Sequence, residues 1–284
     1  MNAGRRSEIR VKGLKLSYLE WGVPRDGAPS LICLHGLLAT GESYARLASE
    51  MGSAAHLVAL DLPGNGESET RRDLDVSFAG LAEVTAAFVD ALGWRSVIMV
   101  GHSHGGALAL RLAVSRPGWL RGMVLLCPAH PFSGHEQKLV DFYLSVPGRV
   151  AAHAIPHLPR AALRWGFRQM LGSAYRGKDE TWFETYERNL RRSGVVSHVL
   201  RVLKSWQEDM ASLDRDLRAG RLAGPVLLMW GAEDRVVPAG SGRALQALLG
   251  RAEMVVLPGL GHLPGEEDPG SCAEVVSEWL VRWR

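Results

Sequence analysis

The sequence of 284 residues has few of the features that mark membrane, secreted or nucleic-acid-binding proteins. It contains no run of about eighteen apolar residues, so no segment is predicted to span a bilayer. The net charge of +3 is too small and too evenly spread to favour a nucleic-acid partner. Arg5 and Arg6 are not followed by the apolar segment that a secretory or twin-arginine signal requires. We therefore expect a cytoplasmic protein.

Cysteine is also scarce. Cys33, Cys127 and Cys272 are odd in number and far apart, and two of them lie in apolar, strand-like runs. A free thiol in such a run behaves as a small hydrophobic side chain. We therefore expect neither a disulfide framework nor a metal site, and no cofactor is predicted.

What the sequence does contain is a regular alternation of short apolar runs and helical patterns. This alternation predicts an α/β fold with a mostly parallel, eight-stranded sheet and helices on both faces. The first two runs alternate apolar and polar residues around Gly13, so they should form an antiparallel hairpin at one edge of the sheet. The predicted strands span residues 8–12, 16–21, 30–34, 56–60, 97–100, 123–127, 225–230 and 252–257.

The alternation stops between residues 129 and 221, where helical patterns occur without a convincing strand. This span holds 15 lysines and arginines against 10 acidic residues. We expect it to form a helical cap inserted into a core domain of residues 1–128 and 222–284. Apolar residues share one predicted helix face at Val195, Val199, Val202 and Trp206, and another at Leu163, Phe167, Met170 and Leu171.

Residues 97–107 read as a strand, a sharp turn and the start of a helix, and the turn is Gly101-His102-Ser103-His104-Gly105. In a Gly-x-Ser-x-Gly turn of this kind the serine has a strained backbone at the end of a sheet strand. Its hydroxyl then lies beside the unpaired N–H groups that open the helix. The two glycines are expected to allow strand and helix to approach closely. The alternative is a turn whose serine only caps the helix.

A serine at its ordinary pKa is a poor nucleophile, so it needs a base and a third group that orients the base. Asp234 follows the strand at 225–230, and His262 follows the strand at 252–257. Both loops leave the same edge of a parallel sheet as the Ser103 turn, so the three side chains can converge. Glu233 is the alternative to Asp234 as the acid.

Five segments together resemble the α/β-hydrolase fold superfamily, and the resemblance covers the chain apart from the predicted cap. In family order they are Leu34-His35-Gly36, residues 61–68, residues 101–106, residues 231–234 with Val237-Pro238, and Gly261-His262. The resemblance implies Ser103 as nucleophile, His262 as general base and then acid, and Asp234 as the orienting carboxylate.

The resemblance also implies an oxyanion hole formed by the backbone N–H groups of Leu37 and His104. His35 and Asp61 are expected to stabilise their loops rather than to take part in the chemistry. In the cap, Trp165, Trp182 and Trp206 are candidates for substrate binding, and we expect one of the three to reach the pocket.

A serine nucleophile with an oxyanion hole indicates acyl transfer to water. The leading hypothesis is a carboxylesterase-like serine hydrolase acting on a small to medium, largely apolar ester. Ser103 argues against epoxide hydrolases and haloalkane dehalogenases of this fold, which use aspartate there. The C–C bond hydrolases usually carry Gly-Pro-Gly where residues 37–41 read Leu-Leu-Ala-Thr-Gly. These hydrolases, lactonases, perhydrolases and a non-catalytic ligand-binding relative are the alternatives.

Overall fold

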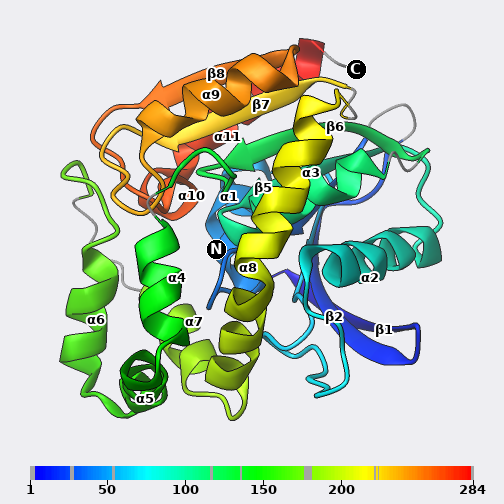
Figure 1. The fold of residues 1–284 in the computed structure, drawn as a ribbon. Helices are drawn as coiled ribbons and strands as arrows, with labels where there is room; N and C mark the ends of the chain where they lie inside the picture. Colours follow the sequence, from blue (N-terminus) through cyan, green and yellow to red (C-terminus); the bar gives the residue numbers. More distant parts are fainter. Residues whose placement is uncertain are drawn as a thin grey trace.

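An eight-stranded sheet forms the centre of the molecule in the computed structural model (Figure 1). The strands lie in the order β1-β2-β4-β3-β5-β6-β7-β8. The hairpin of β1 and β2 is at one edge, and β2 pairs with β4 antiparallel, whereas the pairs from β4 to β8 are parallel. This confirms the predicted sheet. Its strands are β1 (Arg5–Val11), β2 (Leu14–Trp21), β3 (Ser30–Leu34), β4 (Leu57–Leu60), β5 (Val97–His102), β6 (Leu120–Leu126), β7 (Val226–Gly231) and β8 (Ala252–Leu257).

The structure describes residues 4–25, 29–52, 55–115, 118–134, 136–175, 181–220, 222 and 224–282. Within these ranges, no helix is both long enough and apolar enough to cross a membrane. His135, one of the histidines of the predicted cap, lies outside the described residues.

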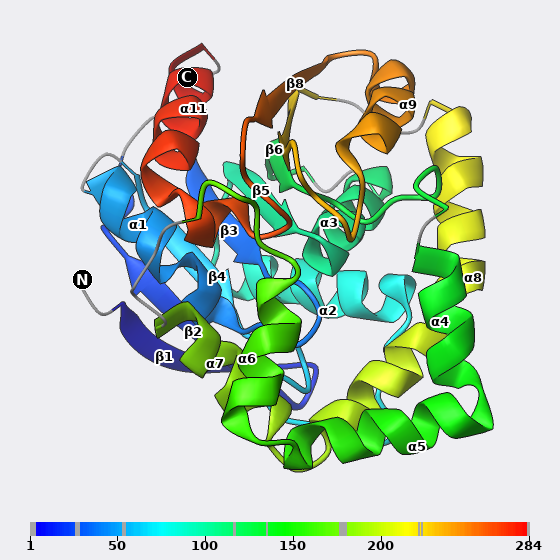
Figure 2. The same cartoon turned by 90° about the vertical axis from the view of Figure 1, so that its left-hand side faces the viewer.

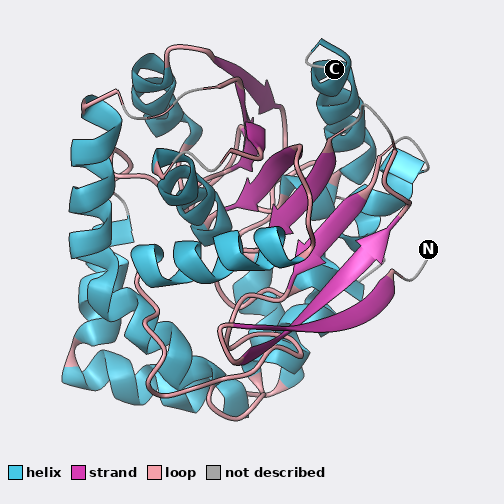
Figure 3. Ribbon diagram, turned by 90° about the vertical axis from the view of Figure 1, so that its right-hand side faces the viewer, coloured by secondary structure: helices cyan, strands magenta, loops and turns pink. Residues whose placement is uncertain are grey.

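Helices cover both faces of the sheet (Figure 3). Because side chains alternate along a strand, β3 sends Ile32 and Leu34 into one core cluster and Leu31 and Cys33 into the other. The first cluster lies under α2 (Phe78–Ala91), α3 (His104–Val114) and α9 (Ala239–Leu249). The second lies under α1 (Ala45–Met51) and α11 (Pro269–Arg282). Two short helices, η1 (Gly41–Tyr44) and α10 (Pro264–Glu267), lead into α1 and α11.

The described residues between β6 and β7 are helical wherever they are regular, and we call these helices the cap helices. They lie beside the sheet rather than in it (Figures 1 and 2). Helix α6 ends at Arg168, so Met170 and Leu171 follow the helix instead of continuing its predicted face. The cap helices are α4 (Glu136–Leu144), α5 (Val146–Ala154), η3 (Ile155–His157), α6 (Arg160–Arg168), α7 (Thr181–Leu190) and α8 (Val195–Arg218).

Helix α8, with 24 residues, belongs to both parts of the molecule. Its middle packs Val202 and Trp206 into a cluster with α4, while its last turns place Leu213 and Leu217 in the main core. The cap helices are therefore tied to the sheet by one continuous helix (Figure 1).

Candidate active site

The turn between β5 and α3 has the strained geometry predicted for it. Ser103 has φ 51° and ψ −117°, a conformation that costs a non-glycine residue about 1–3 kcal/mol. A Cβ on Gly101 would lie 2.6 Å from the carbonyl oxygen of Gly105. A Cβ on Gly105 would lie 2.0 Å from the carbonyl oxygen of Leu34. Gly105 is thus required by the neighbouring strand β3, a constraint that the turn sequence does not reveal.

Three side chains from different loops form a continuous hydrogen-bonded chain at the carboxyl edge of the sheet. The hydroxyl of Ser103 donates to His262 Nε2 over 3.1 Å, and His262 Nδ1 donates to Asp234 Oδ2 over 2.9 Å. His262 and Asp234 are buried, whereas Ser103 is half-buried. The predicted convergence of the three residues is therefore present in the structure, in the geometry that removes a proton from the serine.

The surroundings of Asp234 keep it ionised. Burial alone would raise the pKa of this carboxyl, but the hydrogen bond and the positive charge that His262 can carry lower it, as do two backbone N–H groups. These N–H groups belong to Val236 and Val237 and donate to Oδ1 over 2.8 and 2.9 Å. The net effect is a lowered pKa, so Asp234 remains a carboxylate that can orient a histidine. Glu233 instead accepts hydrogen bonds from Ser173, away from His262.

The loop that carries His262 is held by the cap segment of residues 170–172. The backbone N–H of His262 donates to the carbonyl oxygen of Met170 over 2.7 Å. Glu267 accepts from the N–H groups of Gly172 at 2.7 Å and of Gly261 and Leu263 at 3.0 Å. A Cβ on Gly261 would lie 2.2 Å from the Met170 oxygen. The position of the histidine therefore depends on backbone contacts with the cap.

Of the two predicted oxyanion-hole residues, His104 directly follows Ser103, and Leu37 reaches it from another loop. Helix α3 begins at His104, and the first N–H groups of a helix have no partner within it. Leu37 lies in the loop after β3 and lines the same cavity as Ser103. His35 braces this loop, since its Nδ1 donates to the Gly36 oxygen over 2.8 Å and its Nε2 accepts from Leu62 N at 3.0 Å. The structural role expected for His35 is thus confirmed.

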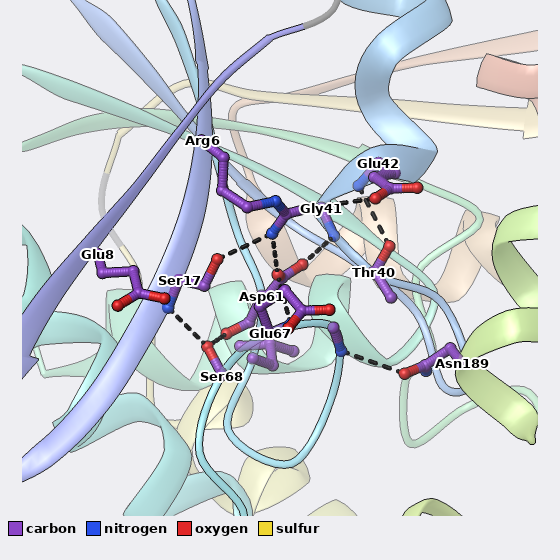
Figure 4. Close-up of polar contacts among 12 residues, drawn as sticks. Arg6, Glu8, Ser17, Thr40, Gly41, Glu42, Asp61, Glu67, Ser68 and Asn189 are labelled. Atoms are coloured by element: carbon purple, nitrogen blue, oxygen red, sulfur yellow. Dashed lines mark hydrogen bonds and ion pairs between the residues drawn. The ribbon is translucent and has the colours of Figure 1, made fainter. Parts of the chain in front are cut away.

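Asn189 of α7 joins the cap to the same loop. Its side-chain nitrogen lies 2.9 Å from the carbonyl oxygen of Leu38 and 3.2 Å from that of Ala39. Its side-chain oxygen accepts from the N–H of Gly66 over 3.1 Å (Figure 4). Leu38 has a positive φ of 64°, which side chains rarely adopt. A buried cap side chain therefore stabilises the strained loop that carries Leu37.

Asp61 is the centre of a second polar cluster, beneath this loop (Figure 4). Its carboxylate is fully buried and accepts from Gly41 N at 2.8 Å, Glu67 N at 3.0 Å and Arg6 Nη1 at 2.7 Å. Arg6 also donates to Glu42, which pairs with Arg188 of the cap. These contacts confirm that Asp61 stabilises its turn.

A cavity of about 330 Å³ lies between the Ser103 turn and the cap helices. Ser103 and His262 line it on the sheet side. Its cap side is almost entirely apolar and includes Val140, Tyr143, Phe167, Val199, Leu203 and Trp206. A largely apolar pocket with a few convergent polar groups is typical of a small-molecule site.

Of the three candidate tryptophans, only Trp206 is among the residues that line this cavity within the described part of the chain. Trp165 is 69% exposed on α6 and is not among the residues that line this cavity. Trp182 is buried in a different cluster, where its indole N–H donates to Tyr175. The sequence pattern does not distinguish the three tryptophans, because which cap helix faces the cavity depends on tertiary packing.

Two residues beside the site have contacts that the sequence did not predict. His102 donates from Nε2 to the carbonyl oxygen of His262 over 2.8 Å, and burial lowers the pKa of His102 to about 3. The sulfur of Cys127 lies within 4.8 Å of the ligand atoms of Asp234 and His262. Burial raises the pKa of this thiol well above its ordinary value, so it stays protonated beside the carboxylate.

Asn189 was also missed, although the sequence holds a signal for it. It occupies a buried position on α7 among Trp182, Phe183, Tyr186 and Leu190. A lone amide on an apolar helix face must find hydrogen-bond partners, since an unpaired polar group is costly to bury.

The fold and the serine–histidine–aspartate arrangement together define an α/β hydrolase. The chain belongs to the family described as the alpha/beta hydrolase fold, whose family model matches residues 29–269. It is 27% identical over 277 residues to the uncharacterized hydrolase YugF of Bacillus subtilis, covering 95% of this chain and 96% of that one.

Solved structures share the fold over nearly the whole chain. A putative lipase from Acinetobacter baumannii has a TM-score of 0.82 at 21% identity, covering 99% of this chain and 92% of its own. The Cif epoxide hydrolase from Acinetobacter nosocomialis has a TM-score of 0.85 at 17% identity, covering 99% of this chain and 90% of its own. These similarities show the fold, on which several chemistries occur.

Proposed function

We propose that this protein is a serine hydrolase that cleaves carboxylic esters with small to medium, largely apolar acyl groups. The observation that carries the proposal is the hydrogen-bonded chain from Ser103 through His262 to Asp234, positioned on the wall of an apolar cavity. The putative lipase among the similar structures is consistent with this chemistry. We further propose that residues 129–221 act as the cap that determines the substrate, on a core of residues 1–128 and 222–284.

In the proposed mechanism, Ser103 attacks the ester carbonyl while His262 Nε2 accepts its proton. The oxyanion of the tetrahedral intermediate is stabilised by the N–H groups of Leu37 and His104. His262 then donates its proton to the departing alcohol, leaving an acyl group on Ser103. Water, deprotonated by His262, attacks this acyl-enzyme and releases the acid, which restores the serine.

Asp234 remains ionised during this cycle and keeps Nδ1 of His262 protonated, so that Nε2 faces the serine. Its lowered pKa supports this role. The apolar cap wall would favour the acyl chain over water, and the cavity volume of about 330 Å³ suits a small to medium substrate.

The test compares wild type with Ser103→Ala on short-chain p-nitrophenyl esters. We expect the substitution to lower kcat by at least about 10⁴-fold, since the nucleophile is lost. Ser115→Ala, which changes an exposed serine at the end of the same helix α3, is the matched control and should retain activity.

Full esterase activity in Ser103→Ala would overturn the mechanism. Labelling of Ser103 by a fluorophosphonate without turnover above one equivalent would instead favour a ligand-binding relative of the hydrolases.

A further inference from the structure

The cap helices expose an unusual amount of apolar surface. Nine large hydrophobic side chains are exposed in the described part of the chain, and six of them lie within residues 139–165. We call these six the apolar cap face. They are Leu139, Phe142, Val146, Val150, Leu158 and Trp165.

Helix α5 shows that this exposure is not a by-product of core packing. Its buried residues are small, Gly148 and Ala152, whereas Val146 and Val150 project outward one turn apart. Val150 is 68% exposed. A surface helix normally buries its large apolar residues and exposes polar ones. The reversed arrangement in α5 indicates an apolar face that contacts another molecule.

The apolar cap face is continuous along the chain with the wall of the active-site cavity. Leu139 is exposed and also lines the cavity that contains Ser103. Phe142 follows it by one turn of α4, and its carbonyl oxygen adjoins Gly148 of α5. The helices α4, α5 and α6 lie on the side of the molecule that faces the viewer in Figure 2. Whatever covers this face therefore lies next to the wall of the cavity that contains Ser103.

The charge around the face indicates what covers it. Residues 138–168 contain five lysines and arginines against one acidic residue, Asp141. Lys138, Arg149 and Arg168 are exposed beside the apolar side chains. Exposed apolar residues flanked by basic ones are the composition of helices that lie in the headgroup region of anionic bilayers.

We propose that the apolar cap face docks on the surface of an anionic phospholipid membrane. Helices α4, α5 and α6 lie in the headgroup region, with the valines, Phe142 and Trp165 in contact with acyl chains. Lys138, Arg149 and Arg168 contact lipid phosphates, whereas Arg160 pairs with Glu184 and Glu187 of α7. Docking places the cavity next to the membrane, where apolar esters are concentrated. The proposal concerns a surface and holds whatever reaction Ser103 supports.

The test is co-sedimentation of the full chain with vesicles of phosphatidylcholine alone and of phosphatidylcholine mixed with phosphatidylglycerol. We expect binding to the mixed vesicles, weakened by high salt, and little binding to phosphatidylcholine alone. Phe142→Ser with Val146→Ser and Val150→Ser should weaken vesicle binding by at least about tenfold.

The matched control is Val256→Ser with Val281→Ser, which removes two exposed valines from the opposite part of the chain, on β8 and α11. This control should bind vesicles as wild type does. The triple variant should hydrolyse a short, water-soluble ester at the wild-type rate, because none of its three residues is among those that line the cavity. Such activity also shows that it is folded.

Two results would overturn the proposal. One is a wild type that does not bind mixed vesicles at low salt. The other is a stable dimer in analytical ultracentrifugation that the triple variant dissociates, since the face would then be covered by a second copy of the chain. Ser103→Ala should bind vesicles normally, so failure of the proposed hydrolysis and failure of docking are distinguishable.

Discussion

The carboxyl edge of the sheet and the cap helices use their buried side chains in opposite ways. At the edge, charged groups are surrounded by partners: Asp234 accepts from His262 and two backbone N–H groups, and Glu267 from three more. On the cap side of the cavity, the walls are almost entirely apolar. Hydrogen bonds are directional, whereas apolar burial is not. The hydrogen bonds at the edge therefore fix one arrangement of side chains, whereas the cap helices set the volume and the polarity of the cavity.

This difference separates two kinds of change. Substitutions at the edge should alter the rate of the chemical step, whereas substitutions in the cap should alter which molecules reach it. The exceptions should include the cap residues that hydrogen-bond the loops around Ser103 and His262, among them Met170, Gly172, Ser173, Ala174 and Asn189.

Asp234→Asn should lower kcat by about 10⁴-fold with little change in KM, because a neutral amide no longer holds His262 in the tautomer that faces Ser103. Steady-state kinetics on a p-nitrophenyl ester measures this. Glu233→Gln, a change of the same kind at the preceding residue, is the matched control. It should stay within about threefold of wild type, since the Glu233 carboxylate accepts hydrogen bonds from Ser173 rather than from His262. A larger loss from Glu233→Gln would make it the catalytic acid.

Asn189→Ala should lower kcat by about tenfold, although the residue is in the cap. The substitution removes the hydrogen bonds to Leu38, Ala39 and Gly66, so the loop that carries Leu37 loses its support. A complete loss of one oxyanion donor costs about 100- to 1000-fold, and a displaced donor costs less.

The control for Asn189 is Gln207→Ala, which removes an amide that bonds within the cap, to Asp141. It should leave kcat unchanged. Tm and the affinity for a transition-state analogue should be measured for both variants. If Asn189→Ala lowers Tm but leaves the affinity for the analogue intact, the residue does not position the oxyanion hole.

His104→Leu should make the protein less sensitive to acid. The His104 ring is buried against Phe78 and Trp206, and burial, followed by the charges of His35 and His198, lowers its pKa from 6.5 to about 3. The folded state therefore keeps this ring neutral while the unfolded chain takes up a proton below pH 6.5. Stability from this group is present above pH 6.5 and is lost as the pH falls toward about 3.

Between pH 6.5 and pH 4 the wild type loses unfolding free energy because of this group, at about 1.36 kcal/mol per pH unit. Removal of His104 should reduce that loss by up to about 3 kcal/mol. Urea unfolding at a series of pH values measures this. His153→Leu, at an exposed histidine of α5, is the control and should follow the wild-type pH dependence. Equal acid sensitivity in His104→Leu and wild type would contradict the prediction.

The sheet and the convergence of Ser103, Asp234 and His262 could be predicted from the sequence because both depend on local signals. Short apolar runs mark the strands, and residues that follow parallel strands meet at one edge. Asn189 and the contact of Met170 with His262 could not be predicted, since they depend on how cap helices pack against distant loops. The same reason explains why the sequence does not distinguish Trp206, which lines the cavity, from Trp165, which is exposed.

The close approach of residues 170–172 to the histidine loop has a consequence for recombination between relatives. A Cβ on Gly172 would lie 2.1 Å from the Gly259 oxygen, and one on Gly261 would lie 2.2 Å from the Met170 oxygen. Residues 170–172 and 259–261 therefore have to come from the same parent protein in order to fit together. A chimaera that exchanges residues 136–168 keeps both segments from one parent. A crossover between residue 172 and the histidine loop instead brings segments from two different parents into this close contact.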